Sequence, residues 1–322
     1  MKIICSTFIL KMVILYSLLI PASGMANEKC LDYCKIIIIS DLNGSYGSTS
    51  YSKAVKDSVN YIIKERPDLV ISTGDHIAGQ KKGLNYKAMW KSFHQTVTTP
   101  LRKANIPLAM TPGNHDASAY RSFLLEREIY INEWPASQSM LRLIDSSKFP
   151  LYYAFSLGSI LFISLDDTTM RLSKEQKAWA QNILKTQGHK FKLKIVFGHI
   201  PLFPFAKGRE TEALFDYEFE QLLNKHKVNI FISGHHHAYY PGHRGNLKLI
   251  STSCLGGGAR PLLHINETRR SPKSIIKLEI YNSKKIDFNA FLPPDFNTII
   301  NKKDLPLSVG HGKSLILKDI DY

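Results

Sequence analysis

Five short apolar stretches of this chain each end in a turn that carries carboxylate, amide or imidazole side chains. The stretches are rich in β-branched and large apolar residues, which is typical of buried strands. They cover residues 35–40, 69–73, 106–111, 194–197 and 229–233. The turns that follow them are Asp41-Leu42-Asn43, Gly74-Asp75, Gly113-Asn114-His115-Asp116, Gly198-His199 and Gly234-His235-His236-His237. Because open α/β sheets gather their ligands at the carboxyl ends of strands, we expect these side chains to meet at one edge.

The order of the other predicted elements indicates the fold class. Helical spacing of apolar residues predicts helices over 51–66, 85–105 with a break near Pro100, 120–131, from Ser173 onward, and 212–225. Further strands are predicted over 152–156, 160–165, 247–253, 274–281 and 285–291, the first two as a hairpin. Alternating strands and helices followed by a strand-rich end suit two packed sheets with helices outside. We expect this domain over residues 27–292 and a peripheral C-terminal tail over 293–322.

Residues 1–26 have the pattern of a secretory signal peptide. Lys2 and Lys11 supply positive charge, an apolar stretch follows, and small residues favour cleavage after Gly24 or Ala26. The apolar stretch is short for a membrane helix of about 20 residues. We therefore expect a secreted or periplasmic protein with no membrane span after cleavage, and an uncleaved anchor is the alternative.

The cysteines agree with export. Cys30 and Cys34 lie close together, just before the first predicted strand. In an oxidising compartment they could form a short disulfide that fixes the start of the mature chain. Cys254 is expected to be a buried thiol of the core.

The polar side chains of the turns suit a site for two divalent metal ions. Two metals about 3.5–4 Å apart can activate a bridging water and neutralise a phosphoryl group, as phosphate ester hydrolysis requires. Asp75 could bridge the ions and Asp41 could hold one of them. The remaining ligands would be Asn114, His199 and His235 or His237.

His236 and His115 lie next to the predicted ligands, and we expect neither of them to bind metal. In an extended segment His235 and His237 point to the same side and His236 to the other, so His236 is expected not to bind metal. His115 is placed to protonate a leaving oxygen or to bind a phosphoryl oxygen, and Asp116 could orient it.

In this order the five motifs resemble those of the calcineurin-like metallophosphoesterase superfamily, which are D-x-H, G-D, G-N-H-[DE], G-H and G-H-x-H. The resemblance covers roughly residues 35–255 and implies a four-layer α/β/β/α sandwich of two mixed sheets flanked by helices. It implies two divalent ions, of manganese, magnesium, iron or zinc. Asp41 and His237 would bind the first ion, Asp75 would bridge, Asn114, His199 and His235 would bind the second, and His115 would be the acid that contacts phosphate.

Two positions refine this resemblance. Residues 234–240 and the helix with Gln176 and Trp179 are similar to the purple acid phosphatase side of the superfamily. Ala78 stands where that side carries its iron-ligating tyrosine, so a purple iron chromophore is not implied. Asn43 stands where the pattern usually has histidine. Either Asn43 is a weaker ligand that favours manganese or magnesium, or it contacts only water or substrate.

The composition agrees with a phosphate ester as the partner and selects no particular one. There are 42 lysines and arginines against 27 acidic residues, a formal net charge of +15. A positive surface attracts anionic substrates, but no basic run is long enough to indicate a nucleic-acid-binding arm. No protein partner is indicated either.

These features predict a secreted, metal-dependent phosphoesterase that hydrolyses phosphomonoesters or phosphodiesters with a metal-bridging hydroxide. Singly, each residue has an ordinary explanation: Asp41 and Asp75 as helix caps, or His199 as a core histidine. The alternative function is a catalytically impaired metal- or phosphate-binding protein on the same fold. In that case, Asn43 in place of histidine would be the first step in the loss of catalysis. The presence of His115 beside Asn114 favours the enzyme.

Overall fold

The computed structural model describes residues 30, 32–282 and 285–319, so the predicted signal peptide over residues 1–26 lies outside the described residues. Cys30 and Cys34 form the expected disulfide, with an S–S distance of 2.04 Å. Cys254 is free and buried, also as expected. Among the helices of the described residues, none is both long enough and apolar enough to span a bilayer.

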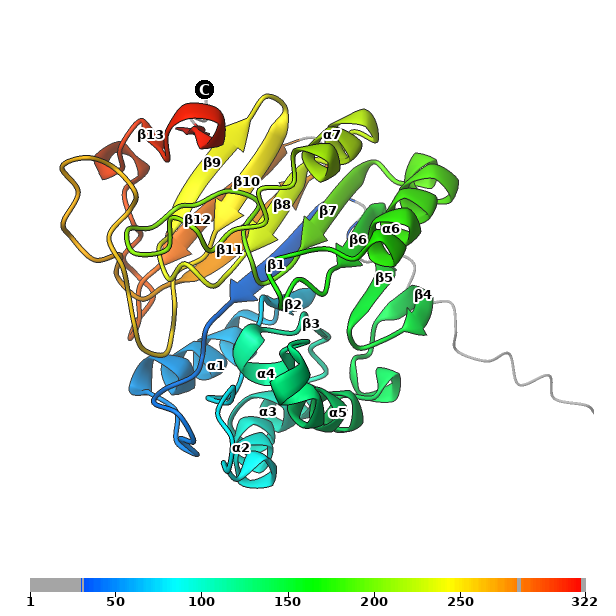
Figure 1. Ribbon diagram of the computed structural model, residues 1–322, viewed down its shortest axis with the longest axis vertical. Coiled ribbons are helices and arrows are strands. Elements are labelled where there is room, and N and C mark those ends of the chain that lie inside the picture. The colour runs from blue at the N-terminus through cyan, green and yellow to red at the C-terminus, as the bar shows by residue number, and fades with distance from the viewer. Residues whose placement is uncertain (1–29, 31, 283–284, 320–322) are drawn as a thin grey trace, which may run out of the picture.

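Two mixed β-sheets form the centre of the molecule (Figure 1). The smaller sheet consists of β1 (Tyr33–Ile39), β2 (Leu69–Ser72), β3 (Leu108–Met110), β11 (Ile275–Tyr281) and β12 (Lys285–Phe291). Its strand order is β12-β11-β1-β2-β3, with β1, β2 and β3 parallel and the other pairs antiparallel.

The larger sheet has nine strands among the described residues, in the order β13-β14-β9-β10-β8-β7-β6-β5-β4. They are β4 (Arg142–Lys148), β5 (Tyr152–Leu157), β6 (Ile160–Ser164), β7 (Leu193–Phe197), β8 (Ile230–Ser233), β9 (Tyr240–Arg244), β10 (Leu247–Ser251), β13 (Ser308–Val309) and β14 (Ile316–Lys318). The four strands from β10 to β6 in this order are parallel, and the outer pairs are antiparallel.

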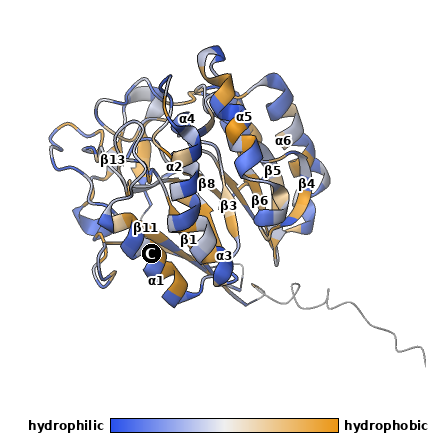
Figure 2. Cartoon of the chain, turned by 90° about the horizontal axis from the view of Figure 1, so that it is seen from below, coloured by the Kyte–Doolittle hydropathy of each residue, from blue (hydrophilic) through white to orange (hydrophobic). Residues whose placement is uncertain are grey.

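Helices cover the outer face of each sheet. The helices are α1 (Lys53–Glu65), α2 (Tyr86–Phe93), α3 (Thr99–Lys103), α4 (Asn114–Ala117), α5 (Leu124–Glu133), α6 (Lys174–Thr186) and α7 (Tyr217–Lys225). Apolar residues of α1, α2, α3 and α5 pack on the small sheet, and those of α6 and α7 pack on the large one. Figure 2 shows hydrophobic and hydrophilic segments alternating along α1, as expected for a helix with one buried face.

Strand β1 shows how the sequence produces these layers. Ile36 and Ile38 lie in the cluster between the two sheets, while Ile37 and Ile39 lie in the cluster beneath the helices. Because side chains alternate across a strand, only a continuous apolar run can bury both faces. Each fully buried isoleucine contributes about 1.5–3 kcal/mol relative to an exposed one. The predicted four-layer α/β/β/α sandwich is confirmed.

Several predicted elements differ in their bounds. The stretch from α2 to α3 is continuous, without the expected break at Pro100, because five π-helical residues (His94–Thr98) join the two helices. In this turn Thr99 N–H donates to His94 O, so the bonding ladder has already shifted before the proline that lacks an N–H. Strands β4 and β9 were not predicted, since β4 is a largely polar edge strand and β9 contains a Pro-Gly pair typical of turns.

The region predicted as a C-terminal tail contributes to the large sheet. Strand β14 pairs with β13 and with β9 and so extends the sheet at one edge. The predicted domain boundary at residue 292 stays a prediction, but the segment after it is integrated into the fold.

Candidate active site

The five predicted turns meet at one edge of the two sheets. Asp41 N–H donates to Gly74 O at 3.1 Å, and Leu42 N–H donates to Asp75 O at 2.9 Å. The turns pack so closely that a Cβ on Gly113 would lie 2.2 Å from Asp75 N. Gly74 combines a φ of +95° with similar crowding against His199, so only glycine fits there.

Four of the predicted metal ligands have left-handed backbone conformations. The φ angles are 50° at Asp41, 57° at Asp75, 62° at His235 and 53° at His237. Such conformations are uncommon outside glycine and concentrate at functional sites. The segment from His235 to His237 is therefore not extended, and the geometric reason that we gave for the direction of these side chains is wrong.

Asp41 and His237 form a buried pair. His237 Nε2 lies 3.0 Å from Asp41 Oδ1, and Ser40 Oγ donates to Asp41 Oδ2 at 2.5 Å. Burial alone would raise the pKa of Asp41, but the charge and hydrogen bond of His237 outweigh it and lower that pKa. Burial would likewise lower the pKa of His237, and Asp41 raises it instead. The pair therefore keeps Asp41 in its carboxylate form although it is buried.

The Nε2 atom of His199 faces two oxygen acceptors, while Nδ1 faces a backbone carbonyl. Its Nδ1 lies 2.7 Å from Thr73 O, so Nδ1 carries the hydrogen that this carbonyl accepts. Its Nε2 lies 3.0 Å from Asn114 Oδ1 and 3.4 Å from Asp75 Oδ1. A lone pair on Nε2 would repel both oxygens. The space between Nε2 and these oxygens therefore favours a cation, either a proton or a metal ion. Burial lowers the pKa of His199, but Asp75 and Asp41 outweigh it and raise the pKa.

The amide of Asn114 is oriented by residues that the sequence did not reveal. Asn114 Nδ2 donates to Gln80 Oε1 at 2.8 Å, which turns Asn114 Oδ1 toward His199. The backbone N–H of Gln80 donates in turn to the buried Glu126 at 2.8 Å. Gln80 lies in a predicted loop five residues after Asp75, so its proximity could be foreseen but not its contact.

His115 presents one ring nitrogen to the pocket. Its Nδ1 lies 3.0 Å from Gly79 O and therefore carries a hydrogen. Its Nε2 is 3.9 Å from Asp75 Oδ2, and the ring of Tyr46 packs against it with a centroid distance of 5.3 Å. His115 N–H also donates to Asp75 Oδ1 at 3.0 Å. Nε2 is thus the atom that can give or take a proton on the pocket side.

The prediction that Asp116 orients His115 is wrong. Asp116 Oδ2 lies 2.8 Å from His76 Nδ1 in a fully buried pair, and Asp116 also accepts N–H groups from Ile77 and Gly113. Asp116 is the third residue of α4, and successive side chains of a helix point in different directions, so residues adjacent in sequence face different partners. Its contacts fix the turns that carry Asp75 and Asn114.

Asn43 donates to the predicted bridging carboxylate. Asn43 Nδ2 lies 3.4 Å from Asp75 Oδ2, and the residue lines the pocket. In this arrangement the amide nitrogen, rather than the ligating oxygen, faces Asp75. Asn43 thus contacts the carboxylate of Asp75, and both alternatives for it, a metal ligand or a residue that contacts only water or substrate, stay predictions.

His235 and His236 have separate partners. His235 Nε2 lies 2.9 Å from Glu212 Oε2 and its ring lies 5.0 Å from that of His199, centroid to centroid. Burial, then the charges of His199 and His236, lower the pKa of His235 well below its ordinary value, so the ring is neutral and Nδ1 keeps the lone pair. His236 accepts from Phe205 N–H and faces Glu212 O, and burial lowers its pKa to about 3. As predicted, His236 points away from the site.

Glu212 was placed at the start of a predicted helix, yet α7 begins at Tyr217 with Asp216 as its N-cap. Glu212 instead contacts His235 and forms an ion pair with Arg209. No sequence signal distinguishes it from the other acidic residues of this segment.

The residues present fit a metal ion. Asp41, Asp75 and His237 each offer a ligand atom, and these atoms all lie within 4.8 Å of one another. Two carboxylates and an imidazole buried together suit a divalent cation of the borderline or hard class. His199 contacts Asp75 and is flanked by Asn114 and His235, and the paired acceptors around His199 Nε2 form a second point that favours a cation.

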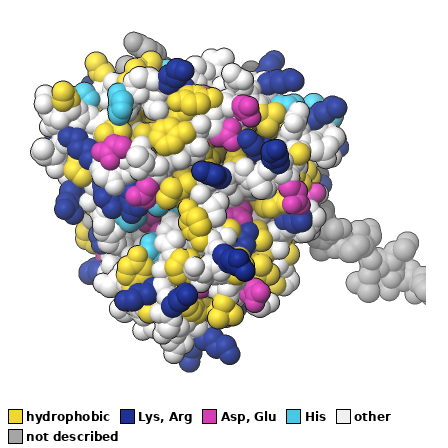
Figure 3. Space-filling view, in the orientation of Figure 1, with side chains coloured by type: hydrophobic (Ala, Val, Ile, Leu, Met, Phe, Trp, Pro, Cys, Tyr) yellow, Lys and Arg dark blue, Asp and Glu magenta, His cyan; other side chains and the backbone are white. Residues whose placement is uncertain are grey.

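Four of the predicted site residues, Asn43, Asp75, His115 and His237, line a cavity of about 550 Å³. It is lined by Leu42, Asn43, Gly44, Ser45, Tyr46, Ser52, Asp75, His115, Arg209, His237, Gly256, Gly257, Gly258 and Arg260. Figure 3 shows lysines and arginines spread over the visible face of the molecule and not gathered in one large patch.

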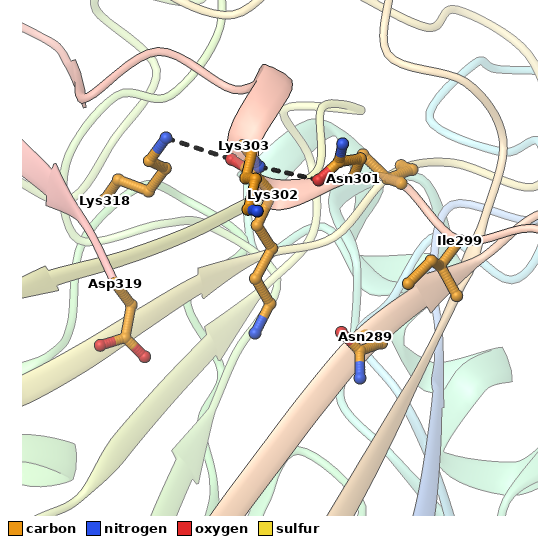
Figure 4. Close-up of a pocket in the computed structure, with 8 residues that line it drawn as sticks. Asn289, Ile299, Asn301, Lys302, Lys303, Lys318 and Asp319 are labelled. Carbon is orange, nitrogen blue, oxygen red and sulfur yellow. Dashed lines mark hydrogen bonds between the residues drawn. The ribbon is translucent and has the colours of Figure 1, made fainter. Parts of the chain in front are cut away.

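A second cavity, of about 490 Å³, lies where β12 meets the C-terminal segment (Figure 4). It is bordered by Lys302, Lys303, Lys318 and Asp319, and the ammonium group of Lys318 donates to Lys302 O at 3.1 Å. None of the predicted ligands borders it. With one carboxylate and no histidine in its lining, this cavity does not resemble a metal site.

Known proteins share the fold of this chain. It is 25% identical over 213 residues to the phosphoenolpyruvate phosphatase of Allium cepa, a match that spans 64% of this chain and 41% of the onion protein. The purple acid phosphatase from yellow lupin seeds superposes with a TM-score of 0.61 at 18% identity, covering 84% of this chain and 53% of the lupin chain. The matched region thus spans less than two thirds of either relative.

Two smaller structures are also similar. A dimetal phosphatase from Danio rerio gives a TM-score of 0.51 at 16% identity, covering 80% of this chain and 98% of that one. GAP50, the anchor in the inner membrane complex of Plasmodium, gives a TM-score of 0.58 at 13% identity, covering 84% of this chain and 88% of that one. At these identities the likeness shows the fold.

Residues 34–239 match the family described as calcineurin-like phosphoesterase. This region contains all five turns and spans more than half of the chain. The protein therefore belongs to the calcineurin-like phosphoesterase family.

Proposed function

We propose that the protein is a secreted phosphoesterase that hydrolyses phosphomonoesters or phosphodiesters with the help of two divalent metal ions. The observation that carries the proposal is the set of acceptor atoms around His199 Nε2, next to the cluster of Asp41, Asp75 and His237. These acceptor atoms repel one another unless cations lie among them. Family membership and the similarity to a phosphoenolpyruvate phosphatase support the same reaction class.

The ligands of the ions are proposed from the same residues. Asp41 and His237 would hold the first ion, Asp75 would contact both, and the second would be held by Asn114, His199 and His235. When bound, the ions supply a deprotonated water at neutral pH and neutralise the charge of the phosphoryl group. Asn43 keeps the carboxylate of Asp75 in place through its amide nitrogen.

His115 would act on the leaving group. The carbonyl of Gly79 holds the hydrogen on Nδ1, so proton exchange takes place at Nε2, which faces the cavity. A protonated Nε2 can donate to the leaving oxygen as the ester bond breaks. Tyr46 packs on the imidazole ring and limits its rotation.

Export is proposed from the sequence pattern of residues 1–26 and from the Cys30–Cys34 disulfide, because disulfides persist in oxidising compartments. N-terminal sequencing of the exported protein checks this part. A first residue near 25–27 supports cleavage, and recovery of the intact chain from membranes supports the anchor.

The reaction is tested with purified mature protein that has been stripped of metal with a chelator. A chromogenic phosphomonoester and a phosphodiester are offered, and manganese, magnesium, zinc or iron is added back in turn. Activity restored by a metal supports the proposal, and the preferred ester and ion define the substrate class. Metal binding without activity toward either ester would favour a binding protein on the same fold.

A further inference from the structure

Arg260 is a cation at the active-site cavity whose side chain has no hydrogen-bond or ion-pair partner among the described residues. Its side chain lines the cavity with Asp75, His115 and His237. Within residues 30, 32–282 and 285–319 its guanidinium makes no ion pair or hydrogen bond, and its Nε is buried without a partner. Burial, then the charge of Arg209, lowers the pKa of Arg260, and the charges of Glu212 and Glu210 oppose this without forming an ion pair with it. A partly buried guanidinium without a carboxylate is costly unless an anion joins it.

The other arginine of the cavity is already neutralised. Arg209 forms an ion pair with Glu212, and Glu212 also accepts from His235. Arg209 is therefore tied to the wall that holds a predicted metal ligand. Arg209 Nε is also buried without a partner, but within the described residues Arg260 is the cavity arginine whose guanidinium has no ion pair.

The backbone positions Arg260 close to the predicted metal site. Its N–H donates to His237 O at 3.3 Å. A Cβ built on Gly208 would lie 3.2 Å from Arg260 Nη1, so the guanidinium lies against the turn at residue 208. The backbone of Arg260 is thus bonded to that of His237, and its guanidinium lies beside Gly208, the residue before Arg209.

The floor of this part of the cavity leaves room for a substrate group. Gly257 has no atom within 4 Å of an added Cβ, so it faces open space. Gly256 and Gly258 also line the cavity, and His115 and Tyr46 belong to the same lining. A leaving group that extends from the metal site can therefore reach the guanidinium.

We infer that Arg260 binds a second anionic group of the substrate, so that the enzyme prefers phosphate esters whose leaving group carries a phosphoryl or carboxylate group. This inference rests on the proposed function. The planar guanidinium forms two parallel hydrogen bonds with either kind of anion, which gives it both affinity and orientation. A substrate without the second anion leaves Arg260 unpaired.

Two matched substrate pairs test the inference. Phosphate release is measured for 3-phosphoglycerate against glycerol 3-phosphate, and for propane-1,3-diol bisphosphate against its monophosphate, with metal-loaded wild-type protein. We expect kcat/KM to be about tenfold higher or more for the bis-anionic member of at least one pair, as one added charge-assisted contact provides. Comparing the kcat/KM ratios of the two pairs shows whether a carboxylate or a phosphoryl group is preferred.

The variants separate a specific contact from general attraction. Arg260→Gln should bring the kcat/KM ratio within the preferred pair close to one. Arg260→Lys should give an intermediate ratio, because lysine keeps the charge but lacks the two parallel N–H donors of the guanidinium. Arg269→Gln is the charge-matched control: Arg269 is exposed on the same loop, pairs with Glu267 and does not line the cavity. It should leave the ratio unchanged.

A wild-type ratio near one, an equal loss for both substrates in Arg260→Gln, or an equal effect of Arg269→Gln would overturn the inference. If no ester is hydrolysed with any ion, the proposed function fails instead. Calorimetric binding of propane-1,3-diol bisphosphate then still tests Arg260. Tighter binding to wild type than to Arg260→Gln supports the contact, and equal binding contradicts it.

Discussion

His199 Nε2 lies 3.0 Å from Asn114 Oδ1, while the other nitrogen of the same ring already donates to Thr73 O. The ring orientation is thus fixed by the backbone of one turn, and its free nitrogen is aimed at an oxygen from another. Asp75 Oδ1 approaches the same nitrogen at 3.4 Å. Three turns that are distant in sequence therefore converge on one point, which a cation would stabilise.

Replacing Asn43 by histidine is expected to alter the metal preference of the site. An imidazole in place of the amide would add a nitrogen ligand and favour zinc over manganese. Changes beside a metal site alter affinity by about 10–100-fold, and we expect a gain at the lower end of that range. Calorimetric titration of zinc and manganese into chelated wild type and Asn43→His checks this. Unchanged affinities for both ions would mean that residue 43 does not reach a metal.

Replacing His115 by alanine is expected to lower kcat by about 10²–10⁴-fold, the usual contribution of a general acid. Metal content should stay close to that of the wild type, because His115 Nδ1 is held by a backbone carbonyl and Nε2 is 3.9 Å from Asp75. Phosphate release and metal content by elemental analysis are measured on the same sample. A parallel loss of metal and activity would make His115 a metal ligand instead of an acid.

Glu126 gives a pH-dependent prediction for stability. Burial raises the pKa of Glu126 above its ordinary value, so the folded protein binds this proton more tightly than the unfolded chain does. Its contribution to stability is complete below the unfolded pKa of about 4.3 and is lost as pH rises through the higher folded pKa. Glu126→Gln keeps an oxygen acceptor for Gln80 N–H but does not titrate.

The free energy of unfolding of Glu126→Gln minus that of wild type should therefore increase between pH 4.5 and pH 7.5. Denaturant titrations at both pH values measure this difference. A constant difference would show that Glu126 has the same pKa in the folded and unfolded states.

The sequence was sufficient to predict where the site lies. Each of the five turns follows an apolar strand, and strand geometry then brings Asp41, Asp75, Asn114, His199 and His237 together. The alternating apolar faces of β1 explain why the four-layer fold could also be predicted. Metal binding by these residues remains a prediction.

Residues whose roles depend on loop conformation could not be found in this way. Gln80 and Arg260 lie in segments without apolar periodicity, and Glu212 lies in a turn where the sequence predicts the start of a helix; the contacts of all three are set by turns that pack from elsewhere in the chain. Asp116 was assigned to the wrong histidine for the same reason, since His76 approaches it from another turn. Sequence adjacency is a poor guide to contact where the backbone turns sharply.

The most direct test of the account is metal-restored phosphoester hydrolysis by Asp75→Asn beside the wild type. Asp75 clusters with Asp41 and His237 and also contacts His199, and metal ions contribute several kcal/mol to transition-state stabilisation. We therefore predict a loss of roughly three orders of magnitude in kcat/KM, with a folded far-UV circular dichroism spectrum. Asp145→Asn, on edge strand β4 and outside the cavity lining, serves as the matched control and should keep full activity. Wild-type activity in folded Asp75→Asn would contradict the account.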